Sequence, residues 1–209
     1  MTDKINLRDM EKKAHKLLNE DGMLELLMGA ILFVSSTSFT GTASFTPFLG
    51  VYVVFMRTII EAYRKRITYP RIGYLKLPDE DAKDVGLGIL MFIGVIMLAL
   101  IVFISLIYGQ VTGGLLFRWI PALIGLILFG GLYYNYERTG DRVNLVYIII
   151  SLLSGIVFSV LGHDNVRAGP AYHLLFLSGV FIVAGVIRLY NFTQRYPVIS
   201  VDERGSDNE

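Results

Sequence analysis

The chain has 209 residues, of which 54% are hydrophobic and only 18% are charged, and its formal net charge is +1. The charged residues gather in a few blocks instead of spreading along amphipathic helices. This pattern excludes an ordinary soluble domain and indicates a multi-pass membrane protein. The absence of cysteine excludes disulfides and thiolate metal sites.

The first 22 residues are polar, and we predict them to be a cytoplasmic, amphipathic lead-in. Apolar residues recur at helical spacing over 6–19, namely Met10, Ala14, Leu17 and Leu18, while basic residues occupy the rest of the turn. The pattern predicts a short interfacial helix. A solvated helix that merely covers neighbouring loops is the alternative.

Six apolar segments approach the length of about 20 residues that a membrane-spanning helix needs. They are residues 23–39, 48–64, 86–108, 115–135, 143–161 and 171–190. We therefore predict an all-α integral membrane protein whose transmembrane domain covers 23–190, with a polar cytoplasmic tail over 191–209. Pro121 falls near the expected start of the fourth span, where a first-turn proline is tolerated.

A weak internal sequence repeat suggests that the six spans form three hairpins. Tyr63 is followed six residues later by Tyr69, and Tyr190 is followed six residues later by Tyr196, with a proline next in both cases. Shared ancestry of the hairpins would explain the repeat. So would coincidence, because tyrosine is common at membrane boundaries and proline often follows a helix end.

Basic residues in the loops orient the spans. They gather before the first span, between spans two and three, between spans four and five, and after span six, whereas the other face has only Arg118 and Arg167. Because cytoplasmic loops carry the excess of lysine and arginine, we predict that both termini are cytoplasmic.

The densest basic block follows the second span over 63–76. We call its candidate binding residues the basic platform: Arg64, Lys65, Arg66, Tyr69, Arg71 and Tyr74. Pro70 is expected to hold the preceding residue in an extended conformation. The platform is either a topology signal with a helix cap or a docking surface for membrane lipid, anionic lipid in particular, or for a protein partner.

Residues 68–74, TYPRIGY, with Arg64 and Arg66 ahead of them, resemble a juxtamembrane segment of uncharacterised multi-spanning prokaryotic membrane proteins. The resemblance implies a location in a prokaryotic plasma membrane. It implies no activity, substrate or cofactor.

Charges inside predicted spans are the best site candidates, because a charge at mid-membrane costs about 2.5–3.5 kcal/mol even on insertion scales. Four share the inner leaflet: Glu25, Arg57, Glu61 and Arg188. They form either a polar cluster between helices or, in the case of Arg57, a side chain that snorkels to the headgroups. We predict that Arg57 pairs with Glu25 or Glu61, since spans one and two are consecutive.

Small residues indicate where helices approach closely. Ser151, Gly155 and Ser159 repeat every four positions, which favours close packing of the fifth span. We expect the glycines of spans three, four and six to serve packing as well, and flexible points are the alternative. These glycines include Gly125, Gly131, Gly179 and Gly185.

Nothing in the chain indicates catalysis. The outer-loop His163 and the interfacial His173 have no spacing typical of a ligand set, and no nucleophile motif or phosphate-binding glycine loop occurs. We therefore expect no enzyme activity, no cofactor, no metal and no nucleic-acid partner.

Two classes of function remain. The first is a non-enzymatic membrane component that binds lipid or a protein partner, a second copy of the chain included, through the basic platform. The alternative is a small transporter for a polar solute or a proton. The transporter requires the inner charged cluster to face a cavity, whereas the membrane component requires those charges to be paired and closed.

Overall fold

The computed structural model describes residues 15–40, 46–73, 104, 113–161, 165 and 167–198. In this part of the chain every regular element is a helix, as predicted. The labelled elements are α2 (Met23–Thr37), α3 (Thr46–Tyr63), the π-helix η2 (Arg64–Thr68), α4 (Tyr69–Ile72), α6 (Gly113–Thr139), α7 (Val143–Val160) and α8 (Ala168–Arg195).

Three described helices are long and apolar enough to cross a membrane: α6 over Phe117–Thr139, α7 and α8. They indicate a multi-pass membrane protein. Helix α2 is apolar but shorter, at 15 residues. The described residues thus supply three such helices where the sequence predicted six spans. The predicted third span, 86–108, lies outside the described residues apart from Ile104.

The predicted lead-in and tail are described only in part. Residues 15–19 are helical, within the predicted helix over 6–19, and residues 20–22 form a turn before α2. Helix α8 continues to Arg195, beyond the predicted boundary at 190. Phe192, in the segment that was predicted as tail, is buried. The buried face of α8 therefore continues past residue 190, and the helix continues with it.

Side chains define both ends of α2. The Asp21 carboxylate accepts the Met23 amide at 3.0 Å and caps the first turn. At the other end the Ser36 and Thr37 hydroxyls each donate to the carbonyl three residues back, at 2.6 Å. Hydroxyl groups that bond to their own helix carry little polar cost in lipid, so the polar end of α2 is compatible with the membrane.

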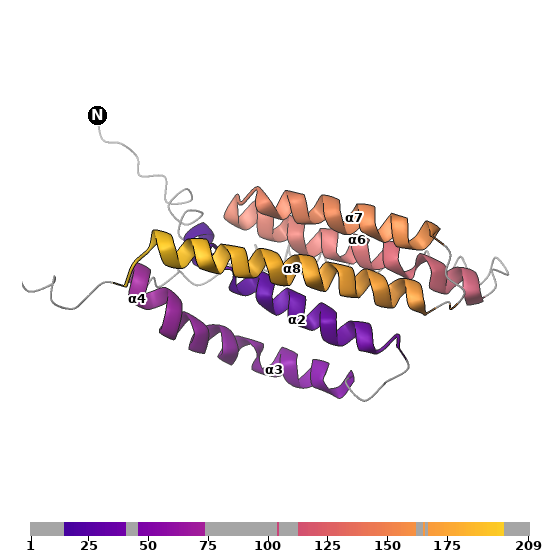
Figure 1. Ribbon diagram of the computed structural model, residues 1–209, viewed down its shortest axis with the longest axis horizontal. Coiled ribbons are helices and arrows are strands. Elements are labelled where there is room, and N and C mark those ends of the chain that lie inside the picture. Colours follow the sequence, from indigo (N-terminus) through magenta and orange to yellow (C-terminus); the bar gives the residue numbers. More distant parts are fainter. Residues whose placement is uncertain are drawn as a thin grey trace, which may run out of the picture.

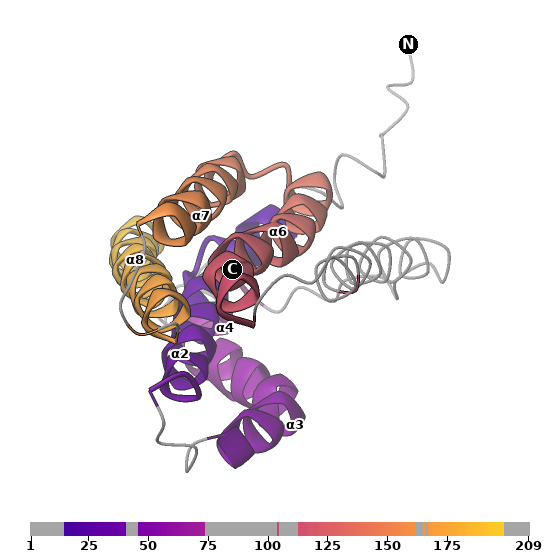
Figure 2. The ribbon, with the colours of Figure 1, turned by 90° about the vertical axis from the view of Figure 1, so that its right-hand side faces the viewer.

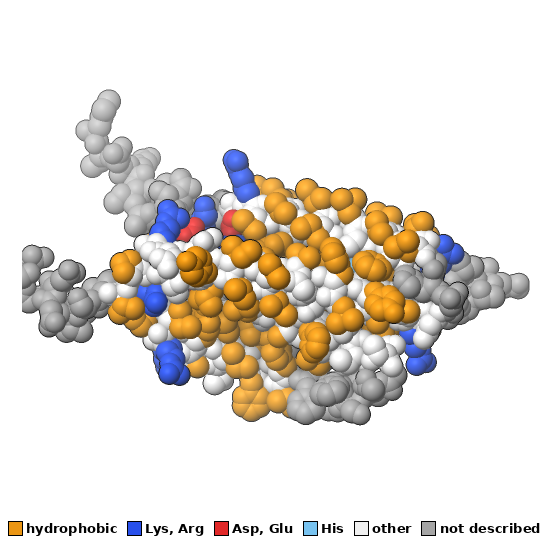
Figure 3. Space-filling model, in the orientation of Figure 1, with side chains coloured by type: hydrophobic (Ala, Val, Ile, Leu, Met, Phe, Trp, Pro, Cys, Tyr) orange, Lys and Arg blue, Asp and Glu red, His pale blue; other side chains and the backbone are white. Residues whose placement is uncertain are grey.

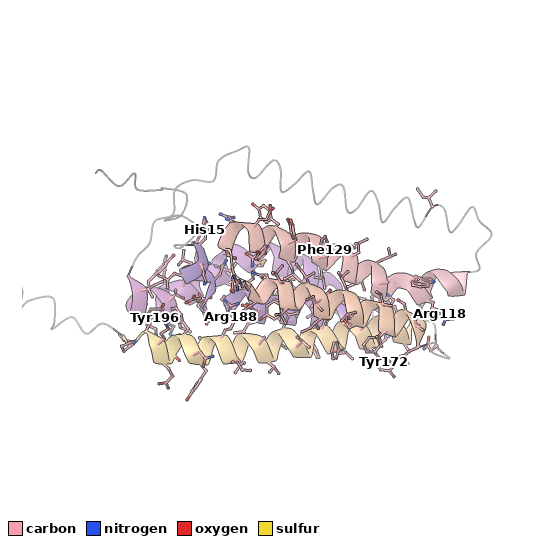
Figure 4. All side chains as sticks on the ribbon, turned by 90° about the horizontal axis from the view of Figure 1, so that it is seen from above. His15, Arg118, Phe129, Tyr172, Arg188 and Tyr196 are labelled. Carbon is pink, nitrogen blue, oxygen red and sulfur yellow. The ribbon has the colours of Figure 1, made fainter. Side chains whose placement is uncertain are left out.

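The helices run roughly parallel along one axis (Figure 1). Seen along that axis, α2, α6, α7 and α8 surround a common interior, and α3 lies outside them against α2 (Figure 2). We call the two extremities the Arg188 end and the Arg118 end (Figure 4). Helices α2 and α7 begin at the Arg188 end, whereas α3, α6 and α8 finish there.

The interior core draws on all four surrounding helices. It comprises Leu32, Leu132, Tyr147, Ile148, Leu174, Leu177 and Phe181. The rings of Tyr147 and Phe181 lie 4.9 Å apart between centroids. Exposed apolar side chains cover the outside of the same helices over the middle of the bundle (Figure 3).

Glycines bring the helices together in two close pairs. A Cβ added at Gly125 of α6 would lie 2.7 Å from the Ser151 carbonyl oxygen of α7, and one at Gly155 would lie 2.7 Å from the Pro121 carbonyl oxygen. A Cβ at Gly185 of α8 would lie 2.9 Å from the backbone nitrogen of Leu26 in α2. The packing roles predicted for Gly125, Gly155 and Gly185 are confirmed.

Two other glycine predictions are wrong. Gly131 and Gly179 have open space where a Cβ would lie, because both point away from the neighbouring helices. The consecutive helices predicted to form hairpins do contact each other where the structure describes both, since α2 packs against α3 and α7 against α8. The closest pairs, however, are α2 with α8 and α6 with α7.

Pro121 lies inside α6 and not in its first turn, because the helix begins at Gly113. Proline has no N–H, so the Phe117 carbonyl lacks its usual helical donor. The amide of the next residue, Ala122, donates to the Ser159 hydroxyl at 3.2 Å. Helix α7 therefore bonds to α6 directly beside the interruption.

We predict that Gly185→Ala lowers the free energy of unfolding by about 1–3 kcal/mol, the usual cost of overpacking. Its new methyl group would meet the Leu26 nitrogen and the Gly22 carbonyl oxygen, at 2.9 and 3.0 Å, and backbone atoms cannot rotate away. Gly179→Ala on the same helix is the matched control and should lose no stability. Equal stability of the two variants in detergent would contradict the close pairing of α2 with α8.

Candidate functional site

Arg188 of α8 is the centre of a buried charged cluster near one end of the bundle (Figure 4). Its guanidinium donates to Oε1 of Glu25 and to Oδ2 of Asp141, each at 2.7 Å, and to the Asn19 carbonyl at 3.0 Å. The side chains of Arg188, Glu25 and Asp141 are 15%, 4% and 11% exposed. We call these three residues the Arg188 triad.

The chain positions each carboxylate by a local turn. Glu25 lies in the first turn of α2. Asp141 follows Gly140, whose φ of 64° ends α6, and its Oδ1 accepts the Val143 amide at 3.2 Å as a cap on α7. The triad therefore joins α8 to the start of α2 and to the turn between α6 and α7.

Side-chain amides extend this polar region. Asn135 of α6 donates to Asn144 of α7 at 3.0 Å, and Asn19 lies 3.4 Å from Asn135. Asn144 in turn donates to the Asp141 carbonyl at 3.2 Å. These bonds hold the turn that presents Asp141 to Arg188.

Glu25 is less completely paired than its neighbours. Besides Arg188, the Tyr147 hydroxyl lies 3.5 Å from Oε1, which is a long hydrogen bond. Its other oxygen, Oε2, is buried and has no hydrogen-bond partner among the described residues. Glu25 as a whole is 3% exposed.

Asp21 connects this cluster to the basic platform. Its Oδ2 accepts the Thr68 hydroxyl at 2.8 Å, and its backbone carbonyl accepts the Tyr63 hydroxyl at 3.3 Å. Burial raises the pKa of the Asp21 carboxyl above its ordinary value, although the Met23 amide, Thr68 and the charge of Arg64 oppose that rise. Asp21 thus fixes the π-helix η2 against the start of α2.

The platform residues lie on a helical continuation of α3. Lys65 and Arg66 are exposed, whereas Arg64 and Arg71 are half-buried, and Arg71 donates to the Ile67 carbonyl at 3.3 Å. Tyr69 is half-buried in α4. The predicted Tyr74 lies outside the described residues.

The expected extended conformation at the residue before Pro70 is wrong. Tyr69 is helical, with φ of −64° and ψ of −35°. The preceding turn is a π-helix, in which the Tyr69 amide donates to the Arg64 carbonyl five residues back. This wider turn accommodates the proline ring that would clash with an ordinary α-helical turn.

The four predicted intramembrane charges are brought together only in part. Arg188 and Glu25 form an ion pair, as a polar cluster requires. Glu61 is exposed on α3. The side chain of Arg57 lies outside the described part of the structure, and so does its predicted pairing with Glu25 or Glu61.

The structure adds residues that the sequence analysis missed. Asp141 was not singled out, although a carboxylate just before an apolar helix is a capping signal. Asp21 was not singled out as a site residue either. His173 was expected at the interface, but it is 0% exposed, with Nε2 lying 3.1 Å from the Ser154 hydroxyl of α7.

The described residues contain no group of three side chains that could hold a metal ion. In comparisons with family models, with curated proteins and with solved structures, nothing matches this chain.

We predict that Arg188→Met lowers the free energy of unfolding by about 3–5 kcal/mol, because it leaves a buried carboxylate without compensation. Adding Asp141→Asn should restore part of the loss. Arg195→Met, which removes an exposed arginine one to two turns further along α8, is the control and should stay within about 0.5 kcal/mol of the wild type. Equal stability of Arg188→Met and Arg195→Met in detergent denaturation would contradict a structural role for the triad.

Proposed function

We propose that this chain is a non-enzymatic, integral membrane component that holds anionic lipid at its basic platform. In this proposal it crosses a prokaryotic plasma membrane six times with both termini in the cytoplasm, and the Arg188 end is cytoplasmic. Three apolar helices of spanning length support the membrane location. The resemblance of residues 68–74 supports the prokaryotic one.

The distribution of charge supports the orientation. Exposed apolar side chains cover the middle of the bundle, and basic side chains lie towards its two extremities (Figure 3). At the Arg188 end the described lysines and arginines other than Arg188 are the exposed Lys16, Lys65, Arg66, Arg142 and Arg195 and the half-buried Arg64, Arg71 and Arg138. At the Arg118 end they are Arg118 and Arg167. An excess of this kind is typical of cytoplasmic faces.

One observation carries the lipid proposal. Lys65 and Arg66 are exposed directly beyond a helix whose outer surface presents Val51, Phe55 and Ile59 to its surroundings. A lipid whose acyl chains lie along α3 would have its headgroup at these two cations. Basic side chains at such a depth attract anionic headgroups by about 1 kcal/mol each.

The paired state of the triad favours this membrane component over a transporter for a polar solute. Arg188 makes two short ion pairs, and its side chain is only 15% exposed. A solute cavity would instead need these charges to face water. Pairing of this kind joins helices, and it suits a rigid base for the platform.

The topology can be tested by cysteine labelling, because the native chain has no cysteine. Single cysteines at Thr42, Thr112 and Asn165 should react with an impermeant maleimide added outside intact cells. Cysteines at the exposed Arg66 and Arg142 should react only after permeabilisation. The neighbouring Thr68 is not a suitable position for a labelling cysteine, because its side chain is fully buried. Labelling of a cysteine at Arg66 from outside would show that the orientation is the opposite of the one proposed. Labelling at Thr42 or Thr112 only after permeabilisation would show that the chain has fewer than six spans.

The lipid role can be tested with two double variants of equal charge. Lys65→Gln with Arg66→Gln should weaken retention of phosphatidylglycerol by about 2 kcal/mol, roughly thirty-fold, in native mass spectra. Arg142→Gln with Arg195→Gln neutralises two exposed cations at the same end but away from the platform. Equal losses in both variants would show a general surface charge and contradict a platform site.

A further inference from the structure

We propose that Glu25 binds an exchangeable proton, so that the Arg188 triad is a proton site entered from the Arg188 end of the bundle. This inference does not depend on lipid binding. It follows from a charge count, from the unequal pairing of three carboxyl groups and from the burial of one oxygen.

The charge count shows an excess of acid. Arg188 contributes one positive charge, yet it contacts two carboxylates at 2.7 Å each. With both ionised, the triad would carry a formal charge of −1. Asp21, four residues before Glu25, is a further acid, and the charge of Arg64 acts on it. A buried charge without compensation is strongly unfavourable. One bound proton makes the triad neutral.

The hydrogen bonds select the carboxyl that takes the proton. Asp141 has both oxygens occupied, one by Arg188 and one by the Val143 amide at the start of α7. Asp21 also has both oxygens occupied, by the Met23 amide and the Thr68 hydroxyl. Glu25 alone of the three has an oxygen, Oε2, that is buried without a partner among the described residues.

The position of the triad provides a route for the proton. Arg188 and Asp141 are 15% and 11% exposed, whereas Glu25 is 4% exposed behind them. A proton from solution at this end adds to the carboxylate of Glu25 and gives the neutral acid. Among the described residues, the titratable and charged groups that act on Glu25 are Asp21, Asp141, Tyr147 and Arg188. Tyr63 and Arg64 act on Asp21.

The test is infrared spectroscopy of the full chain in lipid nanodiscs, titrated across neutral pH. The wild type should show the C=O stretch of a protonated carboxylic acid at neutral pH, and the band should shift on exchange into D₂O. Glu25→Gln should lack this band. Glu61→Gln makes the same chemical change at an exposed position on α3 and should keep it.

A second variant tests the shared charge. In Asp141→Asn, Arg188 has only Glu25 to neutralise, so Glu25 should lose its proton at lower pH and the midpoint of the band should move down. This arm, with the wild-type spectrum, decides the question even if Glu25→Gln fails to fold.

Three results would overturn the proposal. The first is a band that persists in Glu25→Gln, and the second is a midpoint that Asp141→Asn leaves unmoved. The third is a wild-type spectrum without the band at neutral pH. In that third case, stabilisation of the wild type but not of Glu25→Gln by added sodium chloride would show that Glu25 binds a metal cation and not a proton.

Discussion

The double ion pair of Arg188 is the contact on which the arrangement of this bundle depends. Helix α8 packs against α2, α6 and α7, and its one guanidinium reaches the start of α2 and the turn between α6 and α7. In a lipid environment helices gain no hydrophobic energy by meeting one another, so close packing and polar bonds must hold them. Glycine contacts supply the close packing within each helix pair. Arg188 supplies polar bonds between the pairs.

This division explains why the polar residues lie where they do. Within α6 and α7, Gly125 and Gly155 let backbones approach, and the Ser151 and Ser159 hydroxyls bond across the same contact to the Gly125 carbonyl and the Ala122 amide. Between α2 and α8, the Ser178 hydroxyl donates to the Gly29 carbonyl at 2.8 Å. Each of the two close helix pairs thus carries interhelical hydrogen bonds as well as glycine contacts.

The helices could be predicted from the sequence because apolar length is a local property. Helices α2 and α7 end within two residues of the predicted boundaries. Their neighbours could not be predicted in the same way. The partner that the structure shows for Glu25 is Arg188, 163 residues away, and no local pattern in the sequence points to that pair. Asp141 resembled an ordinary loop acid, because nothing local shows that the loop turns inward.

Asp21 links the two sites proposed for the Arg188 end. It precedes Glu25 by one helical turn, and it also holds Thr68 and Tyr63, the residues that frame η2. The charge of Arg64 acts on Asp21, and the charges of Asp21 and Arg188 act on each other and on Glu25. An anionic headgroup drawn to the platform would therefore lie close to a buried group of acids. Neutralising one of those acids with a proton lowers the repulsion between them and the headgroup. The two proposals are thus compatible, because a proton on the triad makes this end of the bundle less negative and so favours binding of an anionic headgroup there.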